Sequence, residues 1–287
     1  MALDDTWFTE ASKGYGMSIK IREKIHDEKS PYQRIEVYET ETFGRLMTLD
    51  GITMLTSRDN FIYHEMLTHP ALFTHSNPKK VIIVGGGDCG SLKEVLKHDR
   101  IKSVVQVELD ERVTWVAEKF FPELCDSNND PRAEFLFQDA IEWMQQADGN
   151  QADVIILDTT DPVGQAARLF SAPFYTDCHR VLRDGGILVG QSESPLFDLD
   201  ILQHMRHAMA EAGFHDIMTI EFPQCTYPSG WWSATMARKA QTLNGFRETA
   251  VRKKKFTTRY YNADIHLACQ ALPNFVREAL DKDSNKQ

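Results

Sequence analysis

A strand, a glycine-rich turn and a helix, together residues 81–98, limit the possible folds of this chain more than any other stretch. Four apolar, mostly β-branched residues at its start predict a buried strand, and its second half has the pattern of a helix. Between them, Gly85, Gly87 and Gly90 stand in the order G-x-G-x-x-G. Glycines at this spacing let a strand turn directly into a helix, and they let a ligand approach the backbone at the start of the helix.

Two acidic residues indicate which kind of ligand this turn binds. Glu108 ends the next strand, about 20 residues after the glycines, where a carboxylate can accept hydrogen bonds from both ribose hydroxyls of an adenosine. Asp88 lies inside the glycine turn itself. Its negative charge repels a phosphate or a carboxylate at this helix end and favours a cation. The turn therefore predicts a site for an adenosine that carries positive charge.

Strands and helices alternate from Lys79 onward, which predicts a mostly parallel sheet with helices on both faces. The residues before about 60 contain only short strands, and Asp50-Gly51 is typical of a hairpin turn. We therefore expect an α/β fold with a small antiparallel β domain at residues 1–60 and a larger domain at 61–287. The expected strands cover residues 18–22, 34–38, 45–49, 52–56, 81–84, 103–107, 134–137, 154–157, 187–189, 217–222 and 232–237.

Acidic residues stand at the ends of four successive predicted strands of the larger domain. They are Asp88, Glu108, Asp139 and Asp158, with Asp161 three residues further on. One such residue usually caps the following helix. Four of them meet at the edge where parallel sheets bind ligands, and they repel one another unless a cation lies there. The cation is either a metal ion or an organic cation such as a sulfonium adenosine, with Asp139 near the adenine amino group.

Asp88 distinguishes between two such adenosines. S-adenosylmethionine, the donor of methyltransferases, has a carboxylate that would face Asp88 in a partly dry site, where like charges repel strongly. The decarboxylated form presents only an aminopropyl cation there, and Asp88 can pair with this cation. The pattern therefore favours decarboxylated S-adenosylmethionine as the donor, and transfer of an aminopropyl group rather than a methyl group.

Composition and charge exclude several other classes of function. The net charge of −10 argues against nucleic acid as the main partner. Five scattered cysteines without a C-x-x-C pair indicate neither a disulfide framework nor a zinc site, and they favour a reducing compartment. We see neither a signal peptide at the N-terminus nor an apolar run long enough to cross a membrane. A cytoplasmic protein without a membrane partner is therefore expected.

Motifs spread over nearly the whole chain resemble those of the polyamine aminopropyltransferases, and most closely those of the spermidine synthases. Each motif alone is common, but their combination is specific to this family. They are Tyr32-Gln33, Leu49-Asp50-Gly51, Phe61-Ile62-Tyr63-His64-Glu65-Met66, Gly85-Gly86-Gly87-Asp88, Val107-Glu108-Leu109-Asp110, Asp158-Thr159-Thr160-Asp161-Pro162, Leu169-Phe170, Gln191, Tyr227-Pro228-Ser229-Gly230, Tyr260-Tyr261-Asn262 and Ile265-His266.

This resemblance implies a Rossmann-like, methyltransferase-type domain behind the N-terminal β domain, in a homodimer or homotetramer. It implies transfer of the aminopropyl group to putrescine, which gives spermidine and methylthioadenosine, with no metal and no cofactor other than the donor itself. It also assigns residues. The implied nucleoside contacts are Gln33, Glu108, Asp139 and the backbone of Ala140, and the implied contacts to the aminopropyl and polyamine amines are Asp88 and His64. The implied general base is Asp158, and the substrate amine is contacted or oriented by Tyr63, Asp161, Gln191 and Tyr227. The resemblance also implies that Trp7 and Glu10 reach the far end of the diamine.

The chemistry of the implied reaction also requires a base. An amine with a pKa near 10.4 is neutral in only about one molecule in 2,500 at pH 7, yet only the neutral amine can attack. Asp158, with the hydroxyls of Tyr63 and Tyr227 nearby, can accept the proton and orient the amine. Because the sulfonium loses its charge as the thioether leaves, the displacement needs no metal.

Several alternatives stay open from the sequence. The acceptor can instead be cadaverine, agmatine or spermidine. A methyltransferase of the same fold and a polyamine sensor without activity are the other two functions. His64 can be an ordinary helix residue, and Tyr63 and Tyr227 can be core aromatics. Three stretches depart from the family pattern, namely Cys89 and Ala140, where the family commonly has glycine, and the loop Gly164-Gln165-Ala166-Ala167-Arg168.

Overall fold

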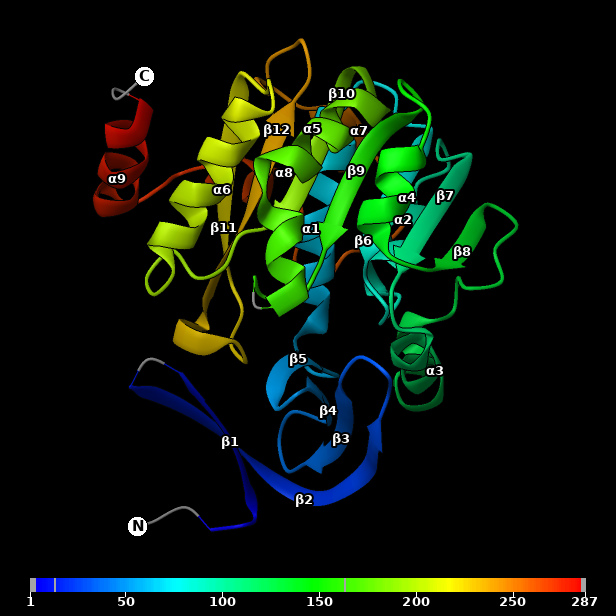
Figure 1. Cartoon of the computed structure of the whole chain (residues 1–287), viewed down its shortest axis with the longest axis vertical. Helices are drawn as coiled ribbons and strands as arrows, with labels where there is room; N and C mark the ends of the chain where they lie inside the picture. The colour runs from blue at the N-terminus through cyan, green and yellow to red at the C-terminus, as the bar shows by residue number, and fades with distance from the viewer. Residues whose placement is uncertain (1–3, 13, 163, 285–287) are drawn as a thin grey trace.

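The computed structural model describes residues 4–12, 14–162 and 164–284, and it contains two sheets. A five-stranded antiparallel sheet formed by the N-terminal residues lies beside a seven-stranded mixed sheet with helices on both faces (Figure 1). This confirms the expected α/β fold with a small antiparallel unit before a Rossmann-like one. The predicted boundary between residues 60 and 61 falls at the start of helix α1 (Asn60–Thr74).

The N-terminal sheet has its strands in chain order, each antiparallel to the next. The hairpin at Asp50-Gly51 forms where the sequence predicts it, and both residues have positive φ. The first strand was not predicted, and the second is three times as long as the expected 18–22. The strands are β1 (Trp7–Ser12), β2 (Tyr15–Lys29), β3 (Arg34–Thr40), β4 (Arg45–Leu49) and β5 (Ile52–Thr56).

The larger sheet has the strand order β11-β12-β10-β9-β6-β7-β8. Its five strands from β10 to β8 run parallel, and β12 is antiparallel to both of its neighbours, so the expected mostly parallel sheet is confirmed. The strands are β6 (Lys80–Gly85), β7 (Ser103–Glu108), β8 (Ala133–Phe137), β9 (Ala152–Asp158), β10 (Leu182–Gln191), β11 (Asp216–Pro223) and β12 (Trp231–Arg238).

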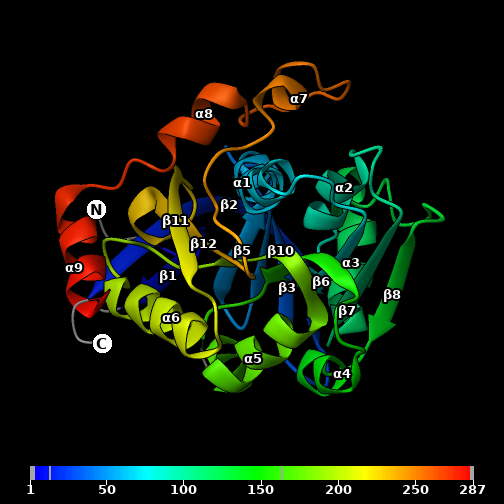
Figure 2. The same ribbon diagram turned by 90° about the horizontal axis from the view of Figure 1, so that it is seen from above.

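Helices cover the two faces of this sheet in separate groups, with α1 and α2 on one face and α4, α5 and α6 on the other (Figure 2). Apolar residues on each strand point alternately to these two layers, which gives two buried clusters. Besides α1, the helices are α2 (Gly90–Leu96), α3 (Glu111–Phe120), α4 (Ala140–Gln146), α5 (Ala172–Val181), α6 (Leu199–Glu211), α7 (Glu248–Arg252), α8 (Ala263–Ala268) and α9 (Asn274–Ser284), with 3-10 turns η1 (Pro122–Leu124), η2 (Gly164–Phe170) and η3 (Pro228–Gly230).

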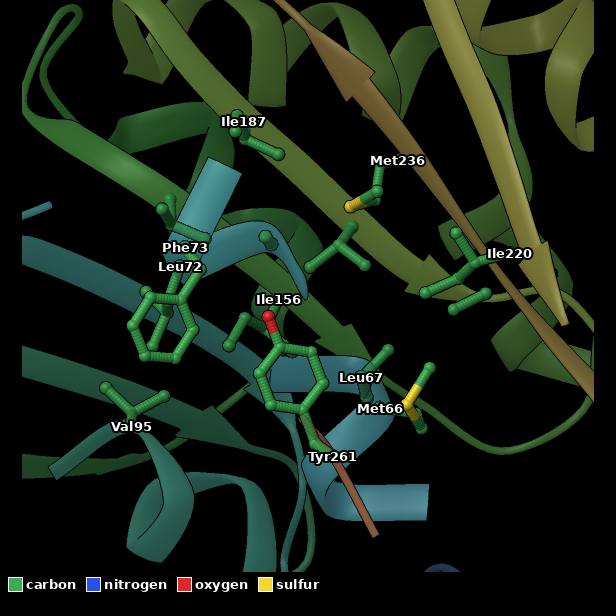
Figure 3. Packing of buried hydrophobic residues seen from close by; sticks show 14 of the residues in the cluster. Met66, Leu67, Leu72, Phe73, Val95, Ile156, Ile187, Ile220, Met236 and Tyr261 are labelled. Atoms are coloured by element: carbon green, nitrogen blue, oxygen red, sulfur yellow. The ribbon is translucent and has the colours of Figure 1, made fainter. Parts of the chain in front are cut away.

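Helix α1 lies across the middle of the molecule and is the element that carries Tyr63 and His64. Its apolar residues Met66, Leu67, Leu72 and Phe73 pack beside the strand residues of the core, as Figure 3 shows. The helix runs unbroken through Pro70. The chain enters α1 shortly after β5, and Thr56 at the end of β5 donates a 2.5 Å hydrogen bond to Asp59 just before α1, so this helix joins the two units.

The N-terminal sheet is attached to the larger unit through α3. Its buried apolar residues form one cluster with Val113, Val116 and Phe121. Polar contacts extend this interface, since Arg112 binds Glu28 through two hydrogen bonds of 2.8 and 2.9 Å. The small sheet therefore buries its apolar face against a helix, which a sheet of this size needs for stability.

Candidate active site

The glycine turn after β6 lies directly against the end of β9. Gly85 has φ +79°, and a Cβ atom at this position would lie 2.2 Å from the carbonyl oxygen of Asp158. The backbone N–H of Gly86 donates a 2.7 Å hydrogen bond to the same oxygen. Only glycine allows this approach. The turn predicted from the sequence therefore also positions Asp158 at the mouth of the sheet.

Asp158 is held by a tyrosine and keeps one free oxygen. The hydroxyl of Tyr63 donates a 2.8 Å hydrogen bond to Oδ1. Oδ2 is buried without a donor in bonding geometry among the described residues. Burial raises the pKa of Asp158 above its ordinary value, and the charge of Asp88 acts in the same direction. A carboxylate with a raised pKa and an unengaged oxygen is a competent proton acceptor.

Asp88 is paired with His64 from α1. Nε2 of His64 lies 3.0 Å from Oδ2 of Asp88, while Oδ1 accepts a 2.7 Å hydrogen bond from the N–H of Gly90. The ring passes so close to the turn that a Cβ on Gly90 would lie 2.2 Å from it. Burial by itself lowers the pKa of His64, but the carboxylate of Asp88, together with the charges of Asp158 and Glu94, raises this pKa to about 9.

This pair bears on two expectations from the sequence. Nε2 of His64 is engaged with Asp88, so His64 has a structural role as the partner of Asp88, and its role as an amine contact stays a prediction. The charge of Asp88 is also partly balanced, and it opposes a donor carboxylate less than an isolated aspartate would. His64, Asp88 and Asp158 each place one ligand atom within 4.8 Å of the others.

Glu108 occupies the expected position at the end of β7, beside the glycine turn. Its Oε1 accepts a 2.8 Å hydrogen bond from the N–H of Asp110, and its Oε2 faces Gly87, where a Cβ would lie 3.1 Å away. Burial raises the pKa of Glu108 to about 7. The free side of this carboxyl group is suited to receive hydroxyl donors.

The other three expected nucleoside residues have structural partners. Asp139 accepts a 2.7 Å hydrogen bond from the N–H of Ile141 and so caps α4, which begins at the buried Ala140. The amide of Gln33 donates a 3.0 Å hydrogen bond to Asp110 and thereby links the N-terminal sheet to the larger unit. The roles of Gln33, Asp139 and Ala140 toward a ligand stay predictions.

A pocket opens beside this centre, between the two units. Tyr63, which bonds to Asp158, is among its lining residues, and its walls are largely apolar and aromatic. Its lining residues are Glu10, Tyr15, Ile52, Thr53, Met54, Tyr63, Thr159, Thr160, Asp161, Pro162, Gln191, Glu193, Phe197, Asp198, Ile201, Tyr227, Pro228 and Trp232. Asp161, Gln191, Tyr227 and Glu10 were expected here from the sequence, whereas Trp7 is not part of this lining.

Tyr227 differs from its expected arrangement. Its hydroxyl donates a 2.5 Å hydrogen bond to the carbonyl oxygen of Met54 on β5, not to Asp158. Its ring lies edge-on to Tyr63 and Trp232, with centroid distances of 5.9 and 4.7 Å. Because the proton of this hydroxyl is engaged, Tyr227 offers only lone pairs to the pocket, which suits an acceptor for an amine donor rather than a proton relay.

The lining of the pocket contains an acidic residue, Glu193, that was not predicted from the sequence. The Glu193 carboxyl lies against that of Asp161, and it accepts a 2.9 Å hydrogen bond from the amide of Gln191. Burial raises the pKa of Asp161 to about 6, and the neighbouring Glu10 adds to this effect. The signal was present, because Glu193 stands just after the strand predicted at 187–189, as the other acids stand after theirs.

Known proteins match this chain over nearly its full length. A sequence model described as "Spermine/spermidine synthase domain" matches residues 60–246, and one described as "Spermidine synthase tetramerisation domain" matches residues 6–57. The chain belongs to the polyamine aminopropyltransferase family. Proteins named polyamine aminopropyltransferase from Nitrosococcus oceani and Methylococcus capsulatus are each 58% identical to it, covering 95% and 96% of this chain and 96% of each relative.

Solved structures agree with this assignment to the aminopropyltransferases. A spermidine synthase in complex with the transition state analogue AdoDATO has a TM-score of 0.93 and 37% identity, and the match covers 98% of this chain and 97% of that one. The spermidine synthase of Thermotoga maritima has a TM-score of 0.91 and 38% identity, with 96% and 94% covered. The chain is therefore an aminopropyltransferase. None of its described helices is long and apolar enough to span a membrane.

Proposed function

We propose that this aminopropyltransferase is a spermidine synthase, which transfers the aminopropyl group of decarboxylated S-adenosylmethionine to putrescine. The products are spermidine and S-methyl-5′-thioadenosine. The observation that carries this proposal is the distribution of charge along the pocket. Acidic groups border the pocket, since Asp161 is in its lining and Asp158 is bonded to the lining residue Tyr63, and the walls are otherwise largely apolar and aromatic. A short diamine has the complementary pattern of two amines joined by methylenes.

Asp158 acts as the general base in this proposal. An amine nitrogen attacks the methylene beside the sulfonium, the carbon–sulfur bond breaks, and its electron pair stays on sulfur. The proton of the amine passes to the unengaged Oδ2 of Asp158. Tyr63 fixes the other oxygen, so that the carboxylate is oriented before the substrates arrive. Positioning two bound substrates in line contributes much of the rate acceleration.

The donor site follows from the glycine turn and its neighbours. Glu108 receives the ribose hydroxyls, and Asp139, the backbone of Ala140 and Gln33 contact the rest of the nucleoside. Asp88 faces the aminopropyl amine while His64 holds it in place. The AdoDATO complex of the structurally similar spermidine synthase supports a donor of this class. The donor is a co-substrate, and the proposal includes no metal.

We also infer a homodimer or homotetramer. The match of residues 6–57 to a spermidine synthase tetramerisation domain supports this state. The unit concerned contains the β1–β2 hairpin, whose Glu10 and Tyr15 line the pocket. Light scattering of the purified chain measures its mass in solution, and a monomer at micromolar concentration would contradict the inference.

The test is a product assay with purified protein. Decarboxylated S-adenosylmethionine is combined separately with putrescine, cadaverine, agmatine and spermidine, and methylthioadenosine and the new polyamine are detected by mass spectrometry. We expect the highest kcat/KM with putrescine. A higher value with another amine would change the acceptor but keep the reaction, while donor binding without product would contradict the proposed function.

The role of Asp158 has its own test. Asp158→Asn keeps the shape and the bond from Tyr63 but cannot take a proton, so we expect kcat to fall by about 10²- to 10⁴-fold. Calorimetric binding of methylthioadenosine serves as the control for folding and should change little. A variant that keeps kcat within a few-fold of the parent would exclude the general-base role.

A further inference from the structure

Gln106 is a polar residue in the interior of the large sheet. It lies on β7 between Val105 and Val107, is fully buried, and points to the same face of the sheet as the core residue Val104. A buried amide lowers stability unless its polar atoms are hydrogen-bonded. Oε1 of Gln106 has no partner among the residues that the structure describes. The position therefore keeps an amide that stability alone does not favour.

The nitrogen of this amide is bonded to the glycine turn. Nε2 of Gln106 donates a 2.6 Å hydrogen bond to the carbonyl oxygen of Gly86. The same oxygen accepts a 2.8 Å hydrogen bond from the N–H of Cys89. Without the amide, the carbonyl of Gly86 would keep the bond from Cys89, so it would not become an unpaired buried acceptor. The bond from Gln106 is therefore not needed to satisfy the backbone, and its effect is to fix the orientation of the turn.

Gly86 is the residue of the turn that touches Asp158 at two points. Its N–H donates to the carbonyl oxygen of Asp158, and a Cβ on Gly86 would lie 3.0 Å from Oδ2, the carboxylate oxygen that is left without a donor. Gly86 has φ +69° and stands between two other glycines, so the local backbone has little preference of its own for this conformation. A displacement of Gly86 would move Oδ2 or open it to water.

We propose that Gln106 is a positioning residue for aminopropyl transfer, which acts through Gly86 to keep Oδ2 of Asp158 in place and shielded from water. Gln106 is not part of the described lining of the pocket, so it acts on the base and not on the acceptor. Small displacements of a reacting group greatly lower the rate, and the effect should therefore appear in kcat. This inference rests on the proposed function, because it concerns the proposed general base.

The first experiment is Gln106→Met, which keeps the length of the side chain and removes both the donor and the unpaired Oε1. We expect kcat with putrescine to fall by about tenfold or more, while KM for putrescine and the Kd of methylthioadenosine stay within about twofold. The midpoint of urea unfolding should stay at or above that of the parent, because an unpaired buried acceptor has been removed.

The matched control is Thr219→Val, which removes a buried 3.0 Å hydrogen bond to Thr235 at the other side of the same sheet. It should leave kcat unchanged. For Gln106→Met, a kcat within about twofold of the parent would overturn the inference. A fall in kcat that accompanies a lower urea midpoint would also overturn it, because the role of Gln106 would then be structural only.

The pH dependence of kcat gives a readout that a purely structural role would not move. Burial raises the pKa of Asp158, and kcat should decrease as the pH falls through this pKa because the base becomes protonated. Water that reaches Oδ2 in Gln106→Met stabilises the charged carboxylate and lowers the pKa of Asp158. The acidic limb of the profile should therefore move to lower pH. An acidic limb at the same pH in both proteins would contradict the proposal.

Gln106→Glu tests the same bond even if Gln106→Met fails to fold. Its new carboxyl can donate to the carbonyl of Gly86 only while it is protonated, since an ionised carboxylate is only an acceptor. The ratio of its kcat to that of the parent should be highest at low pH and fall as this carboxyl ionises. A ratio that does not change with pH would overturn the inference. If the parent transfers no aminopropyl group to any amine, the proposed function itself has failed.

Discussion

The His64–Asp88 pair should make the stability of this protein depend on pH, and substitution of His64 alone should remove this dependence. The pKa of His64 rises from 6.5 to about 9 in the folded chain because Asp88 lies 3.0 Å away. Each unit of pKa shift corresponds to about 1.4 kcal/mol, so this rise in the pKa of His64 contributes about 3 kcal/mol to the folding free energy. The sign follows from proton binding, since the folded state holds a proton that the unfolded state loses above pH 6.5. The contribution is complete below pH 6.5 and disappears as the pH rises through 9.

The assay is urea unfolding followed by circular dichroism at pH values from 6 to 9.5, at one protein concentration because the protein is expected to be oligomeric. His64→Gln keeps a side-chain N–H for Asp88 but cannot titrate. The difference in unfolding free energy between parent and variant should therefore shrink by about 3 kcal/mol across this range. His204→Gln, at an exposed position on α6, is the matched control and should keep the pH dependence of the parent. Parallel curves for the parent and His64→Gln would refute the assigned protonation state.

Three further substitutions test other parts of the site and the fold. Tyr63→Phe removes the 2.8 Å hydrogen bond to Asp158, and we expect kcat to fall by about tenfold or more. Binding of methylthioadenosine, measured by calorimetry, should be retained. An unchanged kcat would contradict the orienting role of Tyr63. Asp88→Asn should narrow the preference for the decarboxylated donor over S-adenosylmethionine, which calorimetry with both donors measures, and an unchanged ratio would reject the charge argument. Glu65→Gln weakens three hydrogen bonds that the buried Glu65 carboxylate accepts from the backbone of residues 259–261, so the unfolding free energy in urea should fall by about 2 kcal/mol with little change in KM. An equally stable variant would show that the charge of Glu65 is not needed.

The sheet and the glycine turn could be predicted because their signals are local. A run of β-branched residues, a glycine spacing and an acid after the next strand each depend on the conformation of a few adjacent residues. Asp158 and Glu108 follow from the rule that parallel strands end at one edge. The same rule, applied to the strand before Gln191, also predicts Glu193 at this edge.

Side-chain partners could not be predicted in the same way. Asp139 and Asp88 look alike in the sequence, yet one caps a helix and the other pairs with a histidine 24 residues before it. Tyr227 lies far from β5 in the chain, and only folding brings its hydroxyl to Met54. The protonation of His64 depends on the distance to Asp88 and on burial, neither of which is a property of neighbouring residues.

The amino-acid sequence alone determines the alternation of strands and helices, the place of the glycine turn and the edge at which the acids gather, because these follow from periodicity and backbone freedom. The packing of α1 and the N-terminal sheet against that edge determines the rest. It places the Tyr63 hydroxyl on Asp158, pairs His64 with Asp88 and encloses Glu193 beside Asp161. Contacts between distant segments set these distances and exclude water, and distance and burial control the charge of each group.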